Sequence, residues 1–191
     1  MKYIACVLLS TVCFLSSCAL VPYRINRSAQ AEDDALFNLE TICSSIQSKD
    51  VETVKNLFSK NALSQVVDYD KQFENLIEFI GDVTSWESDG LHGTYTHSSY
   101  GEKTVEVRTE AKITTDKGKF ILRVLDYPLD TIEEENQGVY MIYIASVEYD
   151  GIKCWRSVKK AGIFIPEVDG IDDIDPELVY GKVEGVEEQV D

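Results

Sequence analysis

The feature that most limits how this chain can fold is a change in the spacing of its apolar residues near Gly81. Before Gly81, apolar side chains recur every three or four positions over residues 32–48, 51–58 and 63–80, as they do in amphipathic helices. After it, residues 104–115 alternate apolar and polar, the spacing of a strand with one covered face. Helices first and strands afterwards predict an α+β domain, with N-terminal helices packed on a curved antiparallel sheet.

Capping and turn residues mark where these elements begin and end. Asp50 is placed to cap the second helix, and Gly81 to end the third, because glycine tolerates the left-handed conformation common at helix C-termini. The segment DKGK at 116–119 predicts a hairpin turn. Three further strands are expected from two mostly apolar runs and from a segment after an Asp-Gly turn: 120–129, 138–149 and 152–159.

The chain begins with a segment typical of secretion signals. Lys2 is followed by an uncharged, mostly apolar run to Leu15, shorter than the roughly 20 residues that a membrane-spanning helix needs. Two small serines then precede Cys18. Residues 1–17 are therefore expected to be a signal peptide.

The sequence Leu15-Ser16-Ser17-Cys18 resembles the lipobox of bacterial lipoproteins. The resemblance implies cleavage before Cys18 and a diacylglycerol on its sulfur, with acyl chains such as palmitate holding the protein on the extracytoplasmic face of the cell membrane. An ordinary cleaved signal that ends in cysteine, or a short anchor helix, stays the alternative. Pro, Ser and Asn in residues 18–31 favour a flexible tether.

The cysteines beyond the signal and Cys18 do not form a disulfide framework. Only Cys43 and Cys154 remain, and whether they pair stays open. Cys43 falls on the apolar stripe of the first helix, so a buried thiol is expected. His92 and His97 lie in a stretch rich in Gly, Ser and Thr, expected to be a loosely ordered hairpin with solvent-facing histidines. Without Cys-x-x-Cys or His-x-x-x-His spacing, no metal or cofactor is predicted.

The chain is strongly acidic, with a formal net charge of −16 at pH 7. Nucleic acid is an unsuitable partner, because binding phosphates needs a basic surface. Acidic residues concentrate in residues 167–191, which predicts a solvated, disordered tail. A calcium loop over 169–177 is the sharper alternative, but its glycine comes second rather than after the acidic ligands. Residues 32–166 are left as one globular domain.

The globular domain contains the segments SKDVETVKNLFSKNAL, FIGDVTSWESDG, TDKGKF and CWRSVKKAGIFIP. These resemble a family of small lipoproteins of Gram-positive bacteria known as domain of unknown function 5104. The order of elements is also similar to the cone-shaped fold of the nuclear transport factor 2-like, or cystatin-like, superfamily. That resemblance implies a pocket between the helices and the concave sheet face, and leaves open a homodimer formed through the sheet. It implies no catalytic residue.

A proton-transfer enzyme in such a pocket needs a carboxylate base and hydrogen-bond donors that converge on one substrate oxygen. Asp126 is the candidate base, since alternation along its strand points it inward. Pro128 predicts that the strand ends there, which would leave Asp126 at the rim in a structural role. The other pocket candidates are hydroxyl donors and apolar walls: Tyr127, Tyr140, Tyr143, Trp86 and Trp155.

Two classes of function stay open. The favoured one is a non-enzymatic, lipid-anchored binding or interaction module, whose pocket holds a small apolar or amphipathic ligand or whose sheet meets another envelope protein. The alternative is a pocket enzyme of the proton-transfer or hydrolytic type that uses Asp126. The first is favoured because the sequence lacks a G-x-S-x-G motif, a Gly-rich phosphate loop or another defined catalytic constellation.

Overall fold

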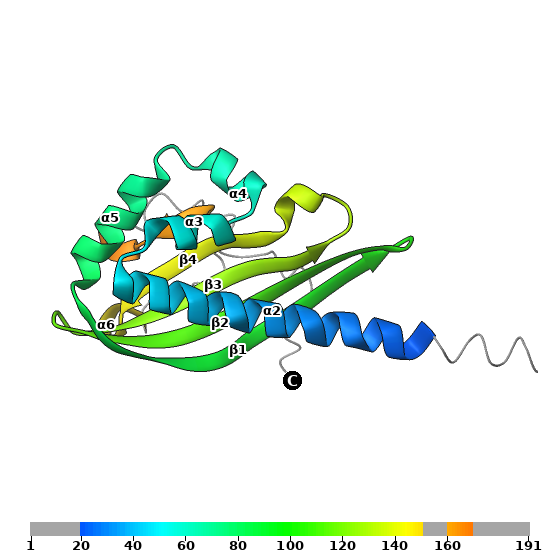
Figure 1. Ribbon diagram of the computed structural model, residues 1–191, viewed down its shortest axis with the longest axis horizontal. Coiled ribbons are helices and arrows are strands. Elements are labelled where there is room, and N and C mark those ends of the chain that lie inside the picture. The colour runs from blue at the N-terminus through cyan, green and yellow to red at the C-terminus, as the bar shows by residue number, and fades with distance from the viewer. Residues whose placement is uncertain (1–19, 151–159, 170–191) are drawn as a thin grey trace, which may run out of the picture.

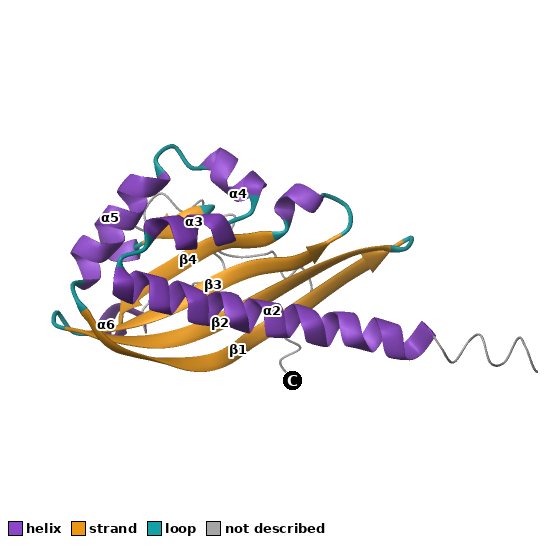
Figure 2. Cartoon of the chain, in the orientation of Figure 1, coloured by secondary structure: helices purple, strands orange, loops and turns teal. Residues whose placement is uncertain are grey.

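The computed structural model describes residues 20–150 and 160–169, and it confirms the α+β class (Figures 1 and 2). None of the helices in these two ranges is both long enough and apolar enough to span a membrane. The elements in chain order are α2 (Leu20–Ser48), α3 (Val51–Leu57), α4 (Lys60–Gln65), α5 (Tyr69–Ile80), β1 (Val83–Ser99), β2 (Glu102–Thr115), β3 (Lys119–Asp130), η1 (Glu134–Asn136), β4 (Gly138–Ser146), α6 (Val147–Asp150), β5 (Gly162–Phe164) and α7 (Pro166–Asp169).

The five strands form one curved, open sheet in the order β1-β2-β3-β4-β5. The first four strands pair antiparallel, and the expected hairpin turn over 116–119 joins β2 to β3. β5 instead pairs parallel with β4, from Met141 opposite Gly162 to Tyr143 opposite Phe164. The sheet is therefore mixed rather than purely antiparallel. The strand expected over 152–159 lies outside the described residues.

Helices α2, α3, α4 and α5 pack on one face of the sheet, and α2 crosses that face (Figure 1). The predicted apolar stripe of α2 is buried: Leu39, Ile42 and Ile46 are 0% exposed, and Cys43 is 1% exposed. These side chains join apolar residues of α5, β3 and β4 in one core. The expected buried thiol is therefore confirmed, and burial raises the pKa of the Cys43 thiol to about 12, which keeps it protonated at neutral pH.

The first helix begins earlier than the sequence suggested. α2 starts at Leu20, within the segment expected to be a flexible tether, and Ala31 is already buried against the sheet. Pro22 is tolerated because it falls in the first turn, where its missing N–H would have no helical partner. The helix can then extend as a continuation of the part that packs on the sheet.

The segment expected to form the third helix forms two. Asp50 caps α3 as predicted, accepting a hydrogen bond from the Thr53 N–H at 3.1 Å. The next segment breaks at Val66, which is extended with φ −95° and ψ 124°, and Asp68 caps α5 by accepting from the Lys71 N–H at 3.0 Å. Gly81 ends α5 as expected, with φ 77°.

The stretch expected to be a loose hairpin with His92 and His97 is instead part of the long strand β1. β1 pairs with β2 as far as Ser99 opposite Glu102, and the hairpin extends beyond α3–α5 (Figure 1). Its register shifts near Gly90 and Gly93. Apolar alternation is absent because much of both faces is exposed, so backbone pairing with β2 defines this strand.

The first residues of the predicted acidic tail belong to the fold. The Glu167 carboxylate accepts a hydrogen bond from the Ser146 N–H at 2.7 Å, and Asp169 accepts one from the Ile165 N–H at 2.8 Å. The expectation of disorder is therefore wrong for Glu167–Asp169, whose carboxylates satisfy backbone donors at the ends of β4 and β5. Residues 170–191, which include most of the calcium-loop alternative, lie outside the described residues.

At Gly138, β4 lies close to the segment that joins α3 to α4, and a substitution there tests this contact. It has φ 121°, and a Cβ would lie 2.8 Å from the Leu57 carbonyl oxygen and 3.0 Å from the Ser59 nitrogen, both backbone atoms. We expect Gly138→Ala to lower the free energy of unfolding by about 2 kcal/mol or more in urea denaturation. Gly101→Ala is the matched control, because Gly101 has φ 92° in open space, and it should cost about 1 kcal/mol. Equal losses would contradict the close contact.

Candidate functional site

Asp126 lies on the face of β3 that meets the helices and is 0% exposed. The inward direction expected from strand alternation is confirmed, since Leu122 and Val124 on the same face are also buried. The expected end of the strand at Pro128 is wrong, because β3 continues to Asp130. Pro128 is tolerated where the register with β2 is irregular, so its missing N–H removes no bond from the regular ladder.

The Asp126 carboxylate is only partly satisfied. The Asn38 side-chain amide of α2 donates to Oδ2 at 2.7 Å, whereas Oδ1 has no hydrogen-bond partner within the described ranges. Burial raises the pKa of Asp126 to about 6. The hydrogen bonds from Asn38 and from the Tyr127 N–H oppose this shift, and the negative charge of Asp34 adds to it.

Asp130 lies four residues further along β3, and its surroundings favour the ionised carboxylate instead of the neutral acid. Burial by itself would raise the pKa of Asp130, yet its pKa is lowered because several hydrogen bonds favour the ionised form. Its carboxylate accepts from the Ile132 N–H at 2.9 Å, the Glu133 N–H at 3.0 Å and the Asn136 amide at 3.1 Å. Asp130 therefore holds the loop before β4, while Asp126 is a buried acid with little support for its charge.

The tyrosine candidates do not converge on Asp126. Tyr127 and Tyr143 belong to the opposite face, where the Tyr127 hydroxyl donates to Glu106 Oε2 at 3.1 Å and the Tyr143 ring lies against Phe164. The Tyr140 hydroxyl donates to the Gln65 side chain at 3.3 Å, at the side of the sheet near α4. A base on one face and donors on the other cannot act on one small substrate.

The two tryptophan candidates give no common wall for a pocket at Asp126. Trp86 is partly buried and packs against the main core beneath the helices. Trp155 lies outside the described residues. Around Trp86, the helix-facing side of the sheet is occupied by buried apolar side chains of the core.

The face of the sheet away from the helices carries a charged network that sequence analysis missed. The alternation over residues 104–115 leaves the polar residues Glu106, Arg108 and Glu110 on the uncovered face, but the side chains of Glu106 and Arg108 are only 12% and 9% exposed and form an ion pair at 2.6 Å. Arg123 pairs with Glu110 at 2.7 Å, and His92 lies 3.6 Å from the same carboxylate. Arg123 and Tyr127 lie on the same side of β3 and contact Glu110 and Glu106. Their spacing along the strand is the sequence signal that this face carries polar residues.

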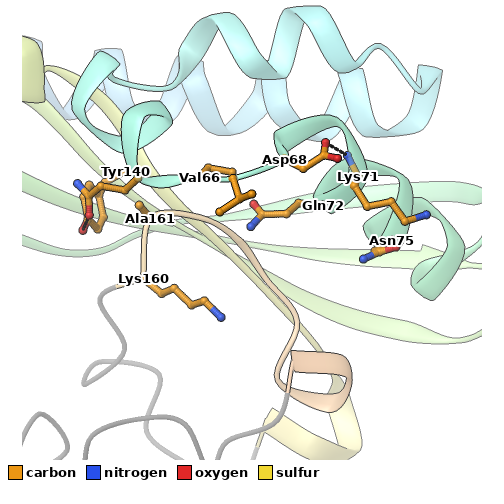
Figure 3. A pocket seen from close by; sticks show the side chains of 10 residues that line it. Val66, Asp68, Lys71, Gln72, Asn75, Tyr140, Lys160 and Ala161 are labelled. Carbon is orange, nitrogen blue, oxygen red and sulfur yellow. Dashed lines mark hydrogen bonds between the residues drawn. The ribbon is translucent and has the colours of Figure 1, made fainter.

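A cleft of about 490 Å³ lies where α4 and α5 meet the side of the sheet formed by β4 and the segment before β5 (Figure 3). Tyr140 is the only predicted candidate among its lining residues. Gln72 helps to shape the cleft, because its side-chain oxygen accepts a hydrogen bond from the Ile163 N–H at 2.9 Å and joins α5 to β5. The lining consists of Gln65, Val66, Val67, Asp68, Lys71, Gln72, Asn75, Tyr140, Lys160 and Ala161.

The cleft has a mixed lining, in which hydrogen-bonding side chains alternate with apolar surface from Val66, Val67 and Ala161. Gln65 and Asn75 carry amides that can both donate and accept hydrogen bonds, and Lys71 and Lys160 add donors. Lys71 also pairs with Glu74 outside the cleft lining, at 3.1 Å. Within the described ranges, no group of three or more His, Cys, Asp or Glu residues could hold a metal ion. The arrangement suits a small hydrogen-bonding ligand.

The raised pKa of Asp126 predicts how stability depends on pH. The pKa of Asp126 is higher in the folded protein than in the unfolded chain, so its protonation stabilises the fold. This contribution to the free energy of unfolding is fully present below the unfolded pKa and is lost as pH rises to about 6. Relative to wild type, Asp126→Asn should gain up to about 3 kcal/mol in free energy of unfolding between pH 4 and pH 7.5.

Urea denaturation across this pH range measures that difference. Asp130→Asn is the contrasting variant, because it removes a carboxylate whose pKa is lowered below 3.8, and its stability difference from wild type should stay nearly constant above about pH 4.5 and change only at lower pH. A constant difference between wild type and Asp126→Asn across the range would contradict a buried, poorly supported carboxylate.

Comparison with known proteins agrees with the resemblance seen in the sequence. The family described as domain of unknown function (DUF5104) matches residues 41–153, from within α2 through the end of β4 and past α6. None of the curated proteins matches the chain. Since the matched range covers more than half of the sequence, the chain belongs to the DUF5104 family of domains of unknown function.

Proposed function

We propose that this protein is a lipid-anchored, extracytoplasmic binding module of the bacterial cell envelope, and that the cleft between α4, α5 and β4 is its ligand site. The observation that carries this proposal is that hydrogen-bonding side chains from three different elements, Gln65, Asn75 and Tyr140, line one cleft. A concave site with several convergent hydrogen-bonding groups is typical of small-molecule recognition.

Binding is better supported than catalysis. The candidate base, Asp126, is closed off beneath α2, and Tyr127 and Tyr143 are on the other side of the sheet. A general base has to reach the proton that it abstracts, directly or through one water molecule. The geometry of these residues therefore gives no support to the alternative of a pocket enzyme that uses Asp126.

The character of the cleft favours a polar ligand over the apolar one expected from the cone-shaped fold. The space between helices and sheet, where an apolar ligand would bind, is filled by core side chains such as Leu39, Ile42 and Leu122. The cleft instead presents amides, a phenol and two ammonium groups. These groups match hydroxyl, amide, carboxylate or phosphate groups on a small molecule.

Attachment to the membrane is supported by the sequence around Cys18. Leu20, the first residue of α2, is two residues after the cysteine that would carry the lipid. The folded domain would then start next to the bilayer. The order of helices before a curved sheet also supports a place in the nuclear transport factor 2-like superfamily, with the parallel strand β5 as a departure from an antiparallel sheet.

Replacement of Cys18 tests the lipid anchor. We expect Cys18→Ser to abolish incorporation of labelled palmitate and to reduce the membrane-bound fraction in cell fractionation, because serine has no thiol to accept diacylglycerol. Cys13→Ser, a change within the expected signal peptide, is the matched control and should keep both the label and the membrane fraction. Palmitate labelling of the Cys18→Ser protein would refute lipidation at this cysteine.

Small polar probes test the cleft. In NMR titrations of the full chain in detergent with N-acetylglucosamine, a dipeptide and inorganic phosphate, we expect at least one probe to shift the amide signals of α5 and β4 around the cleft. Asn75→Ala should weaken that probe about tenfold, because it removes a hydrogen-bonding group from the lining. Asn56→Ala, on α3 and outside the lining, should not. Shifts confined to other surfaces, or an unchanged affinity for Asn75→Ala, would count against this site.

A further inference from the structure

Asp126 joins the middle of α2 to the sheet through one polar contact. The carboxylate is 0% exposed, and its contact with α2 is the 2.7 Å hydrogen bond from Asn38 to Oδ2. The second carboxylate oxygen is buried without a hydrogen-bond partner anywhere in residues 20–150 and 160–169. A buried carboxylate with an unpaired oxygen strongly favours its neutral form over its ionised form.

The groups around Asp126 do little to support a negative charge. Its partners in the sheet register are Val107 on β2 and Val139 on β4, both apolar and fully buried. From α2, Asn38 contributes an amide, and Asp34 one turn earlier contributes a second negative charge that acts on Asp126. The Asn38 amide and the Tyr127 N–H favour the ionised form, but burial and the charge of Asp34 outweigh them.

The helix around this contact is held by a thin apolar layer. Residues 29–38 of α2 pack through Ala31 and Ala35 on Val105 and Val107, with Leu129 alongside. Residues 39–48 pack through larger side chains, such as Leu39, Ile42 and Ile46. Because alanine buries much less apolar area than leucine or isoleucine, residues 29–38 depend more on their polar contact with Asp126.

We propose that Asp126 is a proton-controlled latch for residues 29–38 of α2. When the carboxyl is protonated, these residues lie firmly on the sheet, and when it is ionised they loosen while residues 39–48 stay packed. The pKa of about 6 for Asp126 places the change in a mildly acidic range. If Cys18 carries the lipid as proposed above, the latch also controls how rigidly the domain is held relative to the membrane, but the latch itself does not depend on the anchor.

Hydrogen exchange of the full chain in detergent, measured over a pH series and corrected for the intrinsic exchange rate, tests this latch. At a pH between the pKa of the buried carboxyl, about 6, and that of the freed carboxyl, 3.8, opening of this segment releases a proton from Asp126. The protection of amides 29–38 should therefore fall by up to about tenfold per pH unit between about pH 4 and 6, and should be constant at higher pH. The amides of α5 (Tyr69–Ile80) are the internal control and should keep their protection.

Two variants separate the latch from a general effect of pH. Asp126→Asn should remove the pH dependence in residues 29–38 and keep them protected, because the amide cannot ionise. Asp33→Asn changes an exposed carboxylate on the same helix and should leave the pH profile of the wild type intact. A wild-type profile without pH dependence in residues 29–38, or one that persists in Asp126→Asn, would overturn the latch. If Asp126→Asn does not fold, the contrast between residues 29–38 and α5 in the wild type decides the question.

Discussion

The burial of one apolar stripe of α2 against the concave face of the sheet determines how the rest of the protein is arranged. Leu39, Ile42 and Ile46 are fully buried and share a core with Leu122 and Ile144 of the central strands. Because these side chains fill the space beneath the helix, α4 and α5 meet the sheet beside β4 and β5, and the polar cleft forms there, outside the core.

The elements that could be predicted were those with a strong local pattern. The apolar spacing of residues 32–48, the Asp50 cap and the nearly continuous apolar runs of β3 and β4 each specify their structure within a few neighbouring residues. β1 has no such pattern, since its conformation depends on pairing with β2 rather than on its own burial. The early start of α2 had no local signal either, because Ala31 gains its role only where β2 passes beneath it.

In the candidate site, too, the features with a local sequence pattern could be predicted and those that depend on distant residues could not. Strand alternation was enough to place Asp126 toward the helices, but the amide of Asn38 and the negative charge of Asp34 come from 88 and 92 positions away along the chain. The cleft joins side chains such as Gln65, Tyr140 and Lys160, which share no motif or spacing. Polar residues on exposed helix faces look alike in sequence, and only the packing of α5 against β5 shows which of them share a cavity.

The proton affinity of Asp126 depends on the closed interface beneath α2 and controls the proposed behaviour of residues 29–38, and it can be measured directly. In a ¹³C carboxyl NMR titration of the folded protein, we expect the Asp126 signal to titrate with a midpoint of about pH 6, well above that of Asp130, whose pKa is lowered. A midpoint near the ordinary aspartate value of 3.8 would show that water or another group reaches the carboxylate. It would contradict a sealed interface between α2 and the sheet.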